Sequence, residues 1–319
     1  MSEKKSVYDI VTERILAKMA EGKIPWRVPW RMPKGFEDGY YRNGVSKKAY
    51  RGINRMLLAC SEYKQPDFFT TKQVNALGGT IKDETRFELV TFWKQSKYKK
   101  EEENSETGEI EEVLKKGIIL RYYRVYNREN TDGLPAAKVQ SIAADDKSED
   151  VLEVEANEAA EALIAGYKDR PEIIETQNPQ AYYSPSRDVV HMPNRETFCS
   201  NAEWYSSLFH ELTHSTGSRK RLNREDMRTY GLGKSARARE ELTAEMGAAF
   251  CCESAGILMP VLDNTAAYLQ SWAKQFKGDP KCVVLAAQSA QKAFDWLTGK
   301  YQTYTNAKSA TASQDVAAS

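Results

Sequence analysis

One short stretch constrains this chain more than any other: His210-Glu211-Leu212-Thr213-His214. Histidines at positions i and i+4 of a helix lie on one face, one turn apart, so both imidazoles can bind one tetrahedral cation. Glu211, between them, is placed to act as the catalytic general base toward an attacking water. A capping box of Ser200 and Glu203 precedes the stretch and Gly217 follows it, which predicts a helix over 201–216.

A third metal ligand has to come from a separate helix. The segment 236–256 offers Glu240, Glu241 and Glu245 on an otherwise apolar helix, and a carboxylate on a buried face is costly without a cation. We predict Glu241 as the third ligand and Glu245 as the carboxylate that holds a ligand histidine in its tautomer. The reverse assignment of these two glutamates stays open, and Glu240 is expected to be solvated.

One divalent metal ion is therefore the expected cofactor. Two histidines and a glutamate favour zinc and do not exclude manganese or another ion. A chance match to the motif is disfavoured, because the chain has only three histidines and two of them fall here. A metal that merely holds the fold together, without peptidase activity, is the main alternative.

The net charge of +1 hides a strong asymmetry along the chain. Residues 1–100 carry 21 Lys and Arg against 11 Asp and Glu, whereas residues 141–180 carry 3 against 11. A basic region of this kind is typical of an electrostatic nucleic-acid footprint. Aromatic and basic residues also alternate in the front half, in GKIPWRVPWRMPKG (22–35) and YYRNGVSKKAYRGINR (40–55).

Single-stranded DNA is the partner that this composition favours. Proteins bind single strands by stacking bases on aromatic rings while Lys and Arg follow the phosphates. The candidate DNA contacts are Trp26, Trp30, Tyr41, Lys47, Lys48 and Arg51. The competing interpretation is that the tryptophans pack onto the core and the charges are simply solvated.

The patterning predicts two domains in an α+β chain. The first, a small α+β domain over 1–130, has helices near 7–21, 50–63 and 70–79, strands over 87–95 and 117–127, and a long exposed hairpin loop over 97–116. Residues 131–150 are expected to form a linker or peripheral segment, residues 151–305 a mostly helical domain with a short hairpin near 181–193, and residues 306–319 a disordered tail.

The remaining composition points to a cytoplasmic protein. Five cysteines without CxxC spacing fit reduced thiols better than a disulfide framework. The first residues, MSEKKSVYDI, lack the apolar segment of a signal peptide, and the apolar runs are too short to span a bilayer. No membrane partner is expected.

Blocks from both halves of the chain resemble a known family. EGKIPWRVPW, KKAYRGINRMLL and FTTKQVNALGGTIK resemble successive parts of the N-terminal domain of ArdC-type antirestriction proteins. AYYSPSRDVVHMP, SLFHELTHSTG and REELTAEMGAAF resemble the zincin-like metallopeptidase domain of the same family, in which Glu241 and Glu245 match the spacing of an E-x-x-x-D pair. The chain departs from relatives at Ser215 and Phe69, where tryptophan is common.

The resemblance implies a bacterial, plasmid-borne protein that protects DNA entering by conjugation from restriction. A non-specific domain for single-stranded DNA would be joined to a peptidase-like domain. Two other functions stay open. The chain could be a DNA-binding module with a structural metal, or a peptidase that degrades a host protein and uses DNA only for location.

Overall fold

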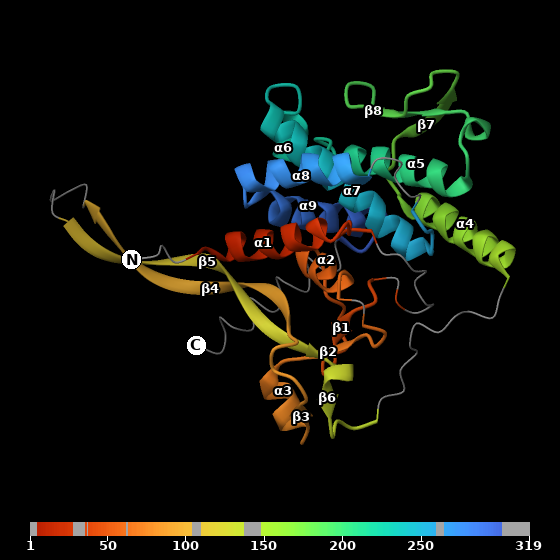
Figure 1. Cartoon of the computed structure of the whole chain (residues 1–319). Helices are drawn as coiled ribbons and strands as arrows, with labels where there is room; N and C mark the ends of the chain where they lie inside the picture. Colours follow the sequence, from red (N-terminus) through yellow and green to blue (C-terminus); the bar gives the residue numbers. More distant parts are fainter. Residues whose placement is uncertain are drawn as a thin grey trace.

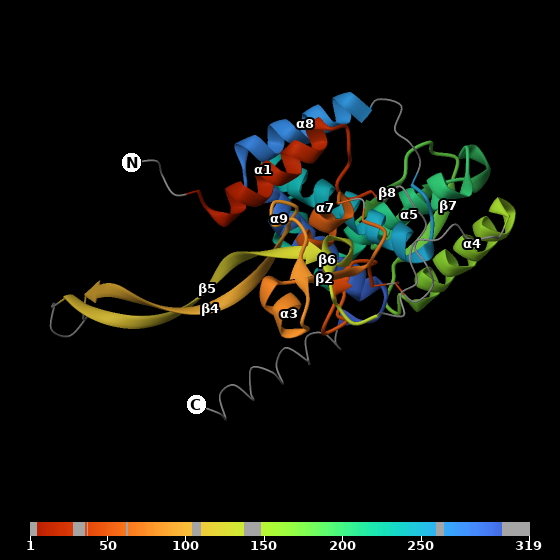
Figure 2. The ribbon, with the colours of Figure 1, turned by 60° about the horizontal axis from the view of Figure 1, so that its bottom comes forward.

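The computed structural model describes residues 5–27, 36, 38–61, 63–103, 110–136, 148–259 and 265–301. A body of packed helices lies above a small region of short strands, and a two-stranded arm projects from one side (Figure 1). The arm extends away from the body in the second view as well (Figure 2). Within the described residues, every helix is too short or too polar to cross a membrane.

The described residues of the front half form three helices. They are α1 (Val7–Ala20), α2 (Ile53–Ala59) and α3 (Thr71–Ala76). Helix α1 begins after Ser6, whose side chain forms a capping box with Asp9. All three lie where the sequence predicted helices, although α2 and α3 are shorter than expected.

The strands of the front half form two sheets. The larger sheet has the order β1 (Arg42–Asn43), β2 (Asp67–Phe69), β5 (Ile110–Asn127) and β4 (Glu88–Glu103). Strands β1 and β2 are parallel, and the other neighbours are antiparallel. A second pair joins β3 (Thr80–Ile81) to β6 (Thr131–Asp132), next to a 3-10 turn at Arg128–Asn130.

The arm corrects one prediction. The segment 97–116 was expected to be a loop, but the β4–β5 ladder continues through most of it, from Glu88 opposite Val125 to Glu103 opposite Ile110. Ladder hydrogen bonds join backbone groups and do not require apolar side chains, so a charged sequence extends the pairing. Residues 104–109, between the two strands, lie outside the described part of the chain.

The rear half is mostly helical and includes a three-stranded sheet. Its helices are α4 (Glu149–Gly166), α5 (Asn201–Thr216), α6 (Glu225–Arg228), α7 (Lys234–Ala255), α8 (Thr265–Gly278) and α9 (Cys282–Leu297), with a 3-10 turn at Arg195–Thr197. Its sheet has the order β7 (Glu172–Thr176), β9 (Val189–Pro193) and β8 (Tyr182–Ser184). The antiparallel β8–β9 pair confirms the predicted hairpin, and β7 adds to it in parallel.

The two halves share a hydrophobic core. One cluster of buried side chains includes Ile15 of α1 and Met56 of α2 together with Leu208 of α5 and Phe294 of α9. A buried ion pair between Arg55 and Glu253 also joins the halves. The division into domains over 1–130 and 151–305 stays a prediction. Residues 137–147 of the expected linker and the whole expected tail, 306–319, lie outside the described residues.

Candidate metal centre

Two helices bring three potential metal ligands together. His210 and His214 come from α5 and Glu241 from α7, and their ligand atoms lie within 4.8 Å of one another. The two Nε2 atoms are 3.1 Å apart, and Glu241 Oε2 is 3.5 Å from Nε2 of His210 and 3.8 Å from Nε2 of His214. Ligands of a tetrahedral zinc ion lie about 3.3–3.5 Å apart. The donor atoms and their spacing therefore fit a divalent cation.

A glycine lets the two helices approach closely beside this cluster. A Cβ at Gly247 of α7 would lie 2.5 Å from Cγ2 of Thr213 in α5, well inside a normal contact distance. Thr213 is itself fully buried, and its hydroxyl donates to the Phe209 carbonyl one turn earlier in α5. The close approach brings the motif face of α5 within reach of the glutamates of α7.

Glu240 orients one of the histidines, which corrects the prediction that this glutamate is solvated. It is fully buried rather than solvated, and its Oε1 is 3.1 Å from Nδ1 of His214. If Nδ1 carries the proton, it donates to this carboxylate and leaves the Nε2 lone pair facing the cluster. For His214 the orienting contact thus comes from Glu240, whereas Glu245 accepts a hydrogen bond from Tyr268. The orienting role of Glu245 toward His210 stays a prediction.

Helical spacing in the sequence could have indicated that Glu240 is buried. Helical spacing places it on one stripe with Ala236, Thr243 and Gly247, and all four are buried or in tight contact. That stripe faces α5, whereas Glu241 lies one residue further around the helix. The Glu241–Glu245 spacing alone does not show which stripe of α7 faces α5.

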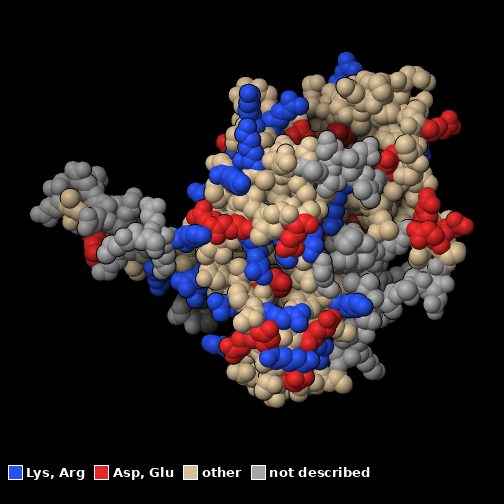
Figure 3. Space-filling model, viewed as in Figure 1, with Lys and Arg blue, Asp and Glu red and all other residues tan. Residues whose placement is uncertain are grey.

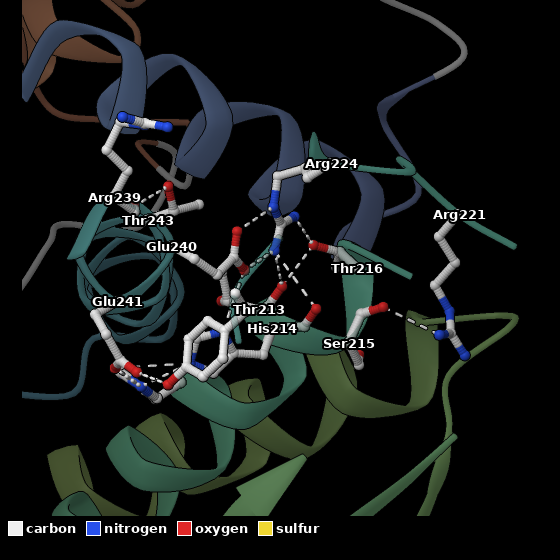
Figure 4. Close-up of polar contacts among 12 residues, drawn as sticks. Thr213, His214, Ser215, Thr216, Arg221, Arg224, Arg239, Glu240, Glu241 and Thr243 are labelled. Atoms are coloured by element: carbon white, nitrogen blue, oxygen red, sulfur yellow. Dashed lines mark hydrogen bonds and ion pairs between the residues drawn. The ribbon is translucent and has the colours of Figure 1, made fainter. Parts of the chain in front are cut away.

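Arg224 compensates the burial of Glu240 (Figure 4). Its Nε donates to Glu240 at 3.0 Å, and its Nη2 donates to the Thr213 carbonyl at 2.8 Å, near the end of α5. Burial alone would raise the pKa of Glu240, but the charge of Arg224 and the hydrogen bond with His214 lower it below its ordinary value. The buried carboxylate is therefore ionised and paired.

Tyr230 fixes the third potential ligand. Its hydroxyl donates to Oε1 of Glu241, and its ring lies edge-on to His214. Burial would raise the pKa of Glu241, but the hydrogen bonds with His210 and Tyr230 prevail and lower it to about 2. Glu241 is thus anionic, with its Oε1 held by Tyr230 and its Oε2 toward the two imidazoles.

Glu211 lies on the same helix with its carboxylate held by a strand. Its Oε2 accepts a hydrogen bond of 2.8 Å from the backbone N–H of Tyr183 in β8. Glu211 is buried, whereas His210 and Glu241 are partly exposed, so solvent reaches one side of the cluster. Structural zinc sites are closed by four protein ligands, whereas catalytic sites have three and an open position. The described residues offer three.

Two of the predicted DNA contacts are buried instead. Trp26 packs edge-on against Trp272 and Phe276, and its Nε1 donates to the Tyr268 hydroxyl at 3.3 Å. Tyr41 is also buried, and its hydroxyl donates to the Tyr63 carbonyl at 2.8 Å. Neither ring offers a face to a base. The competing interpretation, that the tryptophans pack onto the core, holds for Trp26, and Tyr41 is buried as well, because large rings gain most by burial.

The other predicted contacts differ in their surroundings. Lys48 is exposed, and Lys47 is exposed with its Nζ 2.8 Å from Asp67. Arg51 forms an ion pair with Asp295 of α9 and so joins the two halves. Trp30 lies outside the described residues.

Comparisons with known proteins give the same two-part organisation. Residues 5–126 match the N-terminal domain of anti-restriction factor ArdC, and residues 158–289 match a zincin-like metallopeptidase domain. The metal-free crystal structure of the antirestriction ArdC protein from R388 plasmid is 34% identical, with a TM-score of 0.64, over 94% of this chain and 99% of that chain. Its Mn(II)-bound structure is 32% identical, with a TM-score of 0.66, over 93% and 98%.

A longer relative matches as well. DNA primase TraC from Escherichia coli is 28% identical over 309 residues, which is 93% of this chain. The chain spans only 20% of the length of that relative. The identity to a solved structure over nearly the full length of both chains, with both domain matches in the same order, shows that this protein belongs to the ArdC family of antirestriction proteins.

Proposed function

We propose that this protein is a metal-dependent antirestriction protein that acts on DNA entering a bacterial recipient cell. Its front half would bind single-stranded DNA, and its rear half would carry a peptidase-type metal centre. The observation that carries this proposal is the cluster of His210, His214 and Glu241 with Glu211 beside it, in a chain of the ArdC family.

The metal that we propose is zinc. Two imidazoles and one carboxylate suit zinc well, although the related protein from R388 plasmid has been crystallised with Mn(II). A divalent cation bound here would polarise a substrate carbonyl and lower the pKa of a bound water. A competition titration of the metal-free protein with zinc and manganese distinguishes the two, with tighter zinc binding expected.

The chain's own residues would divide the remaining work. His210 and His214 would bind through Nε2, because Nδ1 of His214 faces Glu240. Glu211, oriented by the Tyr183 N–H, would accept the proton of the attacking water. The solvent-facing side of the cluster supports a catalytic site over a purely structural one.

The test of the catalytic role is Glu211→Gln. The amide is close in shape to the carboxylate and cannot act as the base, so fold and metal content should be kept while peptide hydrolysis is lost. Circular dichroism and metal analysis provide the controls. The functional measurement is transfer of unmodified DNA into a restricting recipient. Undiminished protection by Glu211→Gln would remove catalysis from the antirestriction function.

If the peptide substrate is a host protein, that protein should disappear from recipient cells that express the wild type and persist in cells that express Glu211→Gln. A proteome comparison of the two measures this. Identical proteomes would count against a host substrate and leave the DNA-binding part of the proposal intact.

The DNA-binding part is tested on the full chain, because the two halves share a core. Fluorescence anisotropy of labelled single and double strands across a salt series is the measurement. Tight single-strand binding that weakens steeply with salt is expected, since counterions leave the phosphates on binding. A folded chain that does not bind single strands would refute this part.

A further inference from the structure

The β4–β5 arm has a strongly divided charge along its length. Residues 89–100 and 113–125 contain no Asp or Glu and eight basic residues: Lys94, Lys97, Lys99, Lys100, Lys115, Lys116, Arg121 and Arg124. Residues 101–112, between these two segments in the sequence, contain seven glutamates and no Lys or Arg. A polyanion is therefore attracted to the basic segments of the two strands. Basic side chains gather where the arm meets the body in Figure 3.

The register assigns the side chains of this part to two faces. Residues directly opposite each other in an antiparallel ladder share a face, and so do residues two apart along a strand. Phe92 lies opposite Arg121, Lys94 opposite Ile119, and Val90 opposite Tyr123. Phe92, Tyr123, Lys94 and Arg121 thus share one face, here called the stacking face.

Aromatic rings continue along the stacking face from the interior to the solvent. Nearer the body, Val90 and Tyr50 belong to a buried, mostly aromatic cluster. The Tyr50 and Phe92 ring centroids are 6.5 Å apart, and those of Phe92 and Tyr123 are 5.8 Å apart. Outside this cluster the rings are open to solvent: the exposed fraction is 48% for Phe92 and 40% for Tyr123. Two supported rings therefore present open faces to solvent beside two exposed cations.

The opposite face of the arm lacks this ring-to-ring support. Trp93 and Tyr122 lie there with similar exposure, 45% and 43%, and neither makes a ring contact with another residue of the described part of the chain. The exposed cations Lys97, Lys116 and Arg124 share this face with the exposed aliphatic side chains of Ile118 and Leu114. Charge therefore does not separate the two faces, and the stacking face is favoured because its two rings support each other.

We propose that the stacking face is where single-stranded DNA binds, with bases against Phe92 and Tyr123 and phosphates against Lys94 and Arg121. This inference rests on the proposed function and adds the location of the strand. In a duplex both faces of each base are covered by its neighbours, so an exposed ring cannot stack on it. The stacking face thus gives a physical reason for preferring single strands.

The test compares matched pairs of substitutions on the two faces in the full-length protein. Phe92→Leu with Tyr123→Leu keeps apolar volume and removes both rings, and Trp93→Leu with Tyr122→Leu does the same on the opposite face. Anisotropy with a labelled oligothymidylate strand should show a loss of affinity of about five- to a hundred-fold for each ring removed, and so of at least about thirty-fold for the first pair. The second pair should bind like the wild type, and duplex binding should be unchanged in both.

Two further variants make the test independent of folding defects. Phe92→Tyr keeps a ring and should keep the affinity, while melting temperatures report any loss of stability. Lys94→Gln and Arg121→Gln should each reduce the salt slope by about 0.7 per lost phosphate contact.

Each other outcome has a distinct meaning. Wild-type affinity in Phe92→Leu with Tyr123→Leu would refute the stacking face and leave DNA binding in place. Equal losses on both faces would refute the choice of face. A wild-type protein that binds no single strand would refute the proposed function itself.

Discussion

The metal centre and the stacking face differ in how their side chains are held. In the metal centre three of the four proposed working side chains are fixed by a partner from another element: His214 by Glu240, Glu241 by Tyr230, and Glu211 by the Tyr183 backbone. On the stacking face, Phe92 and Tyr123 contact each other and remain half exposed. Metal ligation requires fixed geometry, whereas base stacking tolerates many arrangements. Substitutions should therefore have steep effects in the first region and graded effects in the second.

The steepest expected effect is on metal binding in His210→Ala. Removing one of three ligands should lower the affinity by more than about a hundred-fold, since even residues that only orient a ligand cost ten- to a hundred-fold. Isothermal titration of the metal-free variant with zinc measures the loss. The stacking-face double variant is the control and should bind metal like the wild type. A normal zinc affinity in His210→Ala would contradict the steep effects that we expect in the metal centre.

Trp26→Ala tests whether the front half's aromatic residues are structural. A buried tryptophan replaced by alanine costs about 3–5 kcal/mol of unfolding free energy. Urea denaturation measures this, and Trp26→Phe should recover most of the stability. The folded Trp26→Phe protein should bind single strands as the wild type does. A large loss of DNA affinity in Trp26→Phe without a loss of stability would show that Trp26 contacts DNA after all.

Glu240→Gln sharpens the account of the metal centre. The amide cannot supply the charge that pairs with Arg224 and His214, so metal affinity should fall about ten- to a hundred-fold. Glu245→Gln is the matched control five residues along α7 and should change affinity much less. If Glu245→Gln has the larger effect, the orienting role belongs to Glu245 as the sequence suggested.

Gly247→Ala tests the contact between α5 and α7 and should have the smallest effect. The added methyl meets Thr213, and overpacking of this kind costs about 1–3 kcal/mol of unfolding free energy. Gly166→Ala in α4 is the control, because a Cβ there meets nothing within 4 Å and alanine favours the helix. Equal stability of the two variants would show that α7 moves away from α5 at no cost.

The metal motif was predictable from the sequence because residues four apart in a helix lie next to each other on one face. The sequence alone placed α5 and the His210–His214 pair and selected Glu241 from α7. The role of Glu240 depends on which stripe of α7 faces α5, and that is decided by the helix crossing at Gly247. Arg224 lies on a connecting segment before α6, where no periodicity reveals its direction.

The DNA contacts of the front half were harder to predict, because composition does not show whether a side chain points into the interior or toward solvent. The stripe of aromatic and basic residues over 22–55 is real, but Trp26 and Tyr41 point into the interior. The exposed rings lie on the arm, whose strands extend into a segment that looked like a loop. The alternation of β4 and β5 could be read from the sequence, but only the ladder's register shows that Phe92 and Tyr123 share a face.

The most direct test of the metal centre is anomalous diffraction from crystals of the zinc-loaded protein, recorded on both sides of the zinc absorption edge. We expect one strong peak bounded by Nε2 of His210, Nε2 of His214 and a carboxylate oxygen of Glu241, with Glu240 still hydrogen-bonded to Nδ1 of His214. A peak elsewhere, or zinc bound without Glu241, would contradict this expectation.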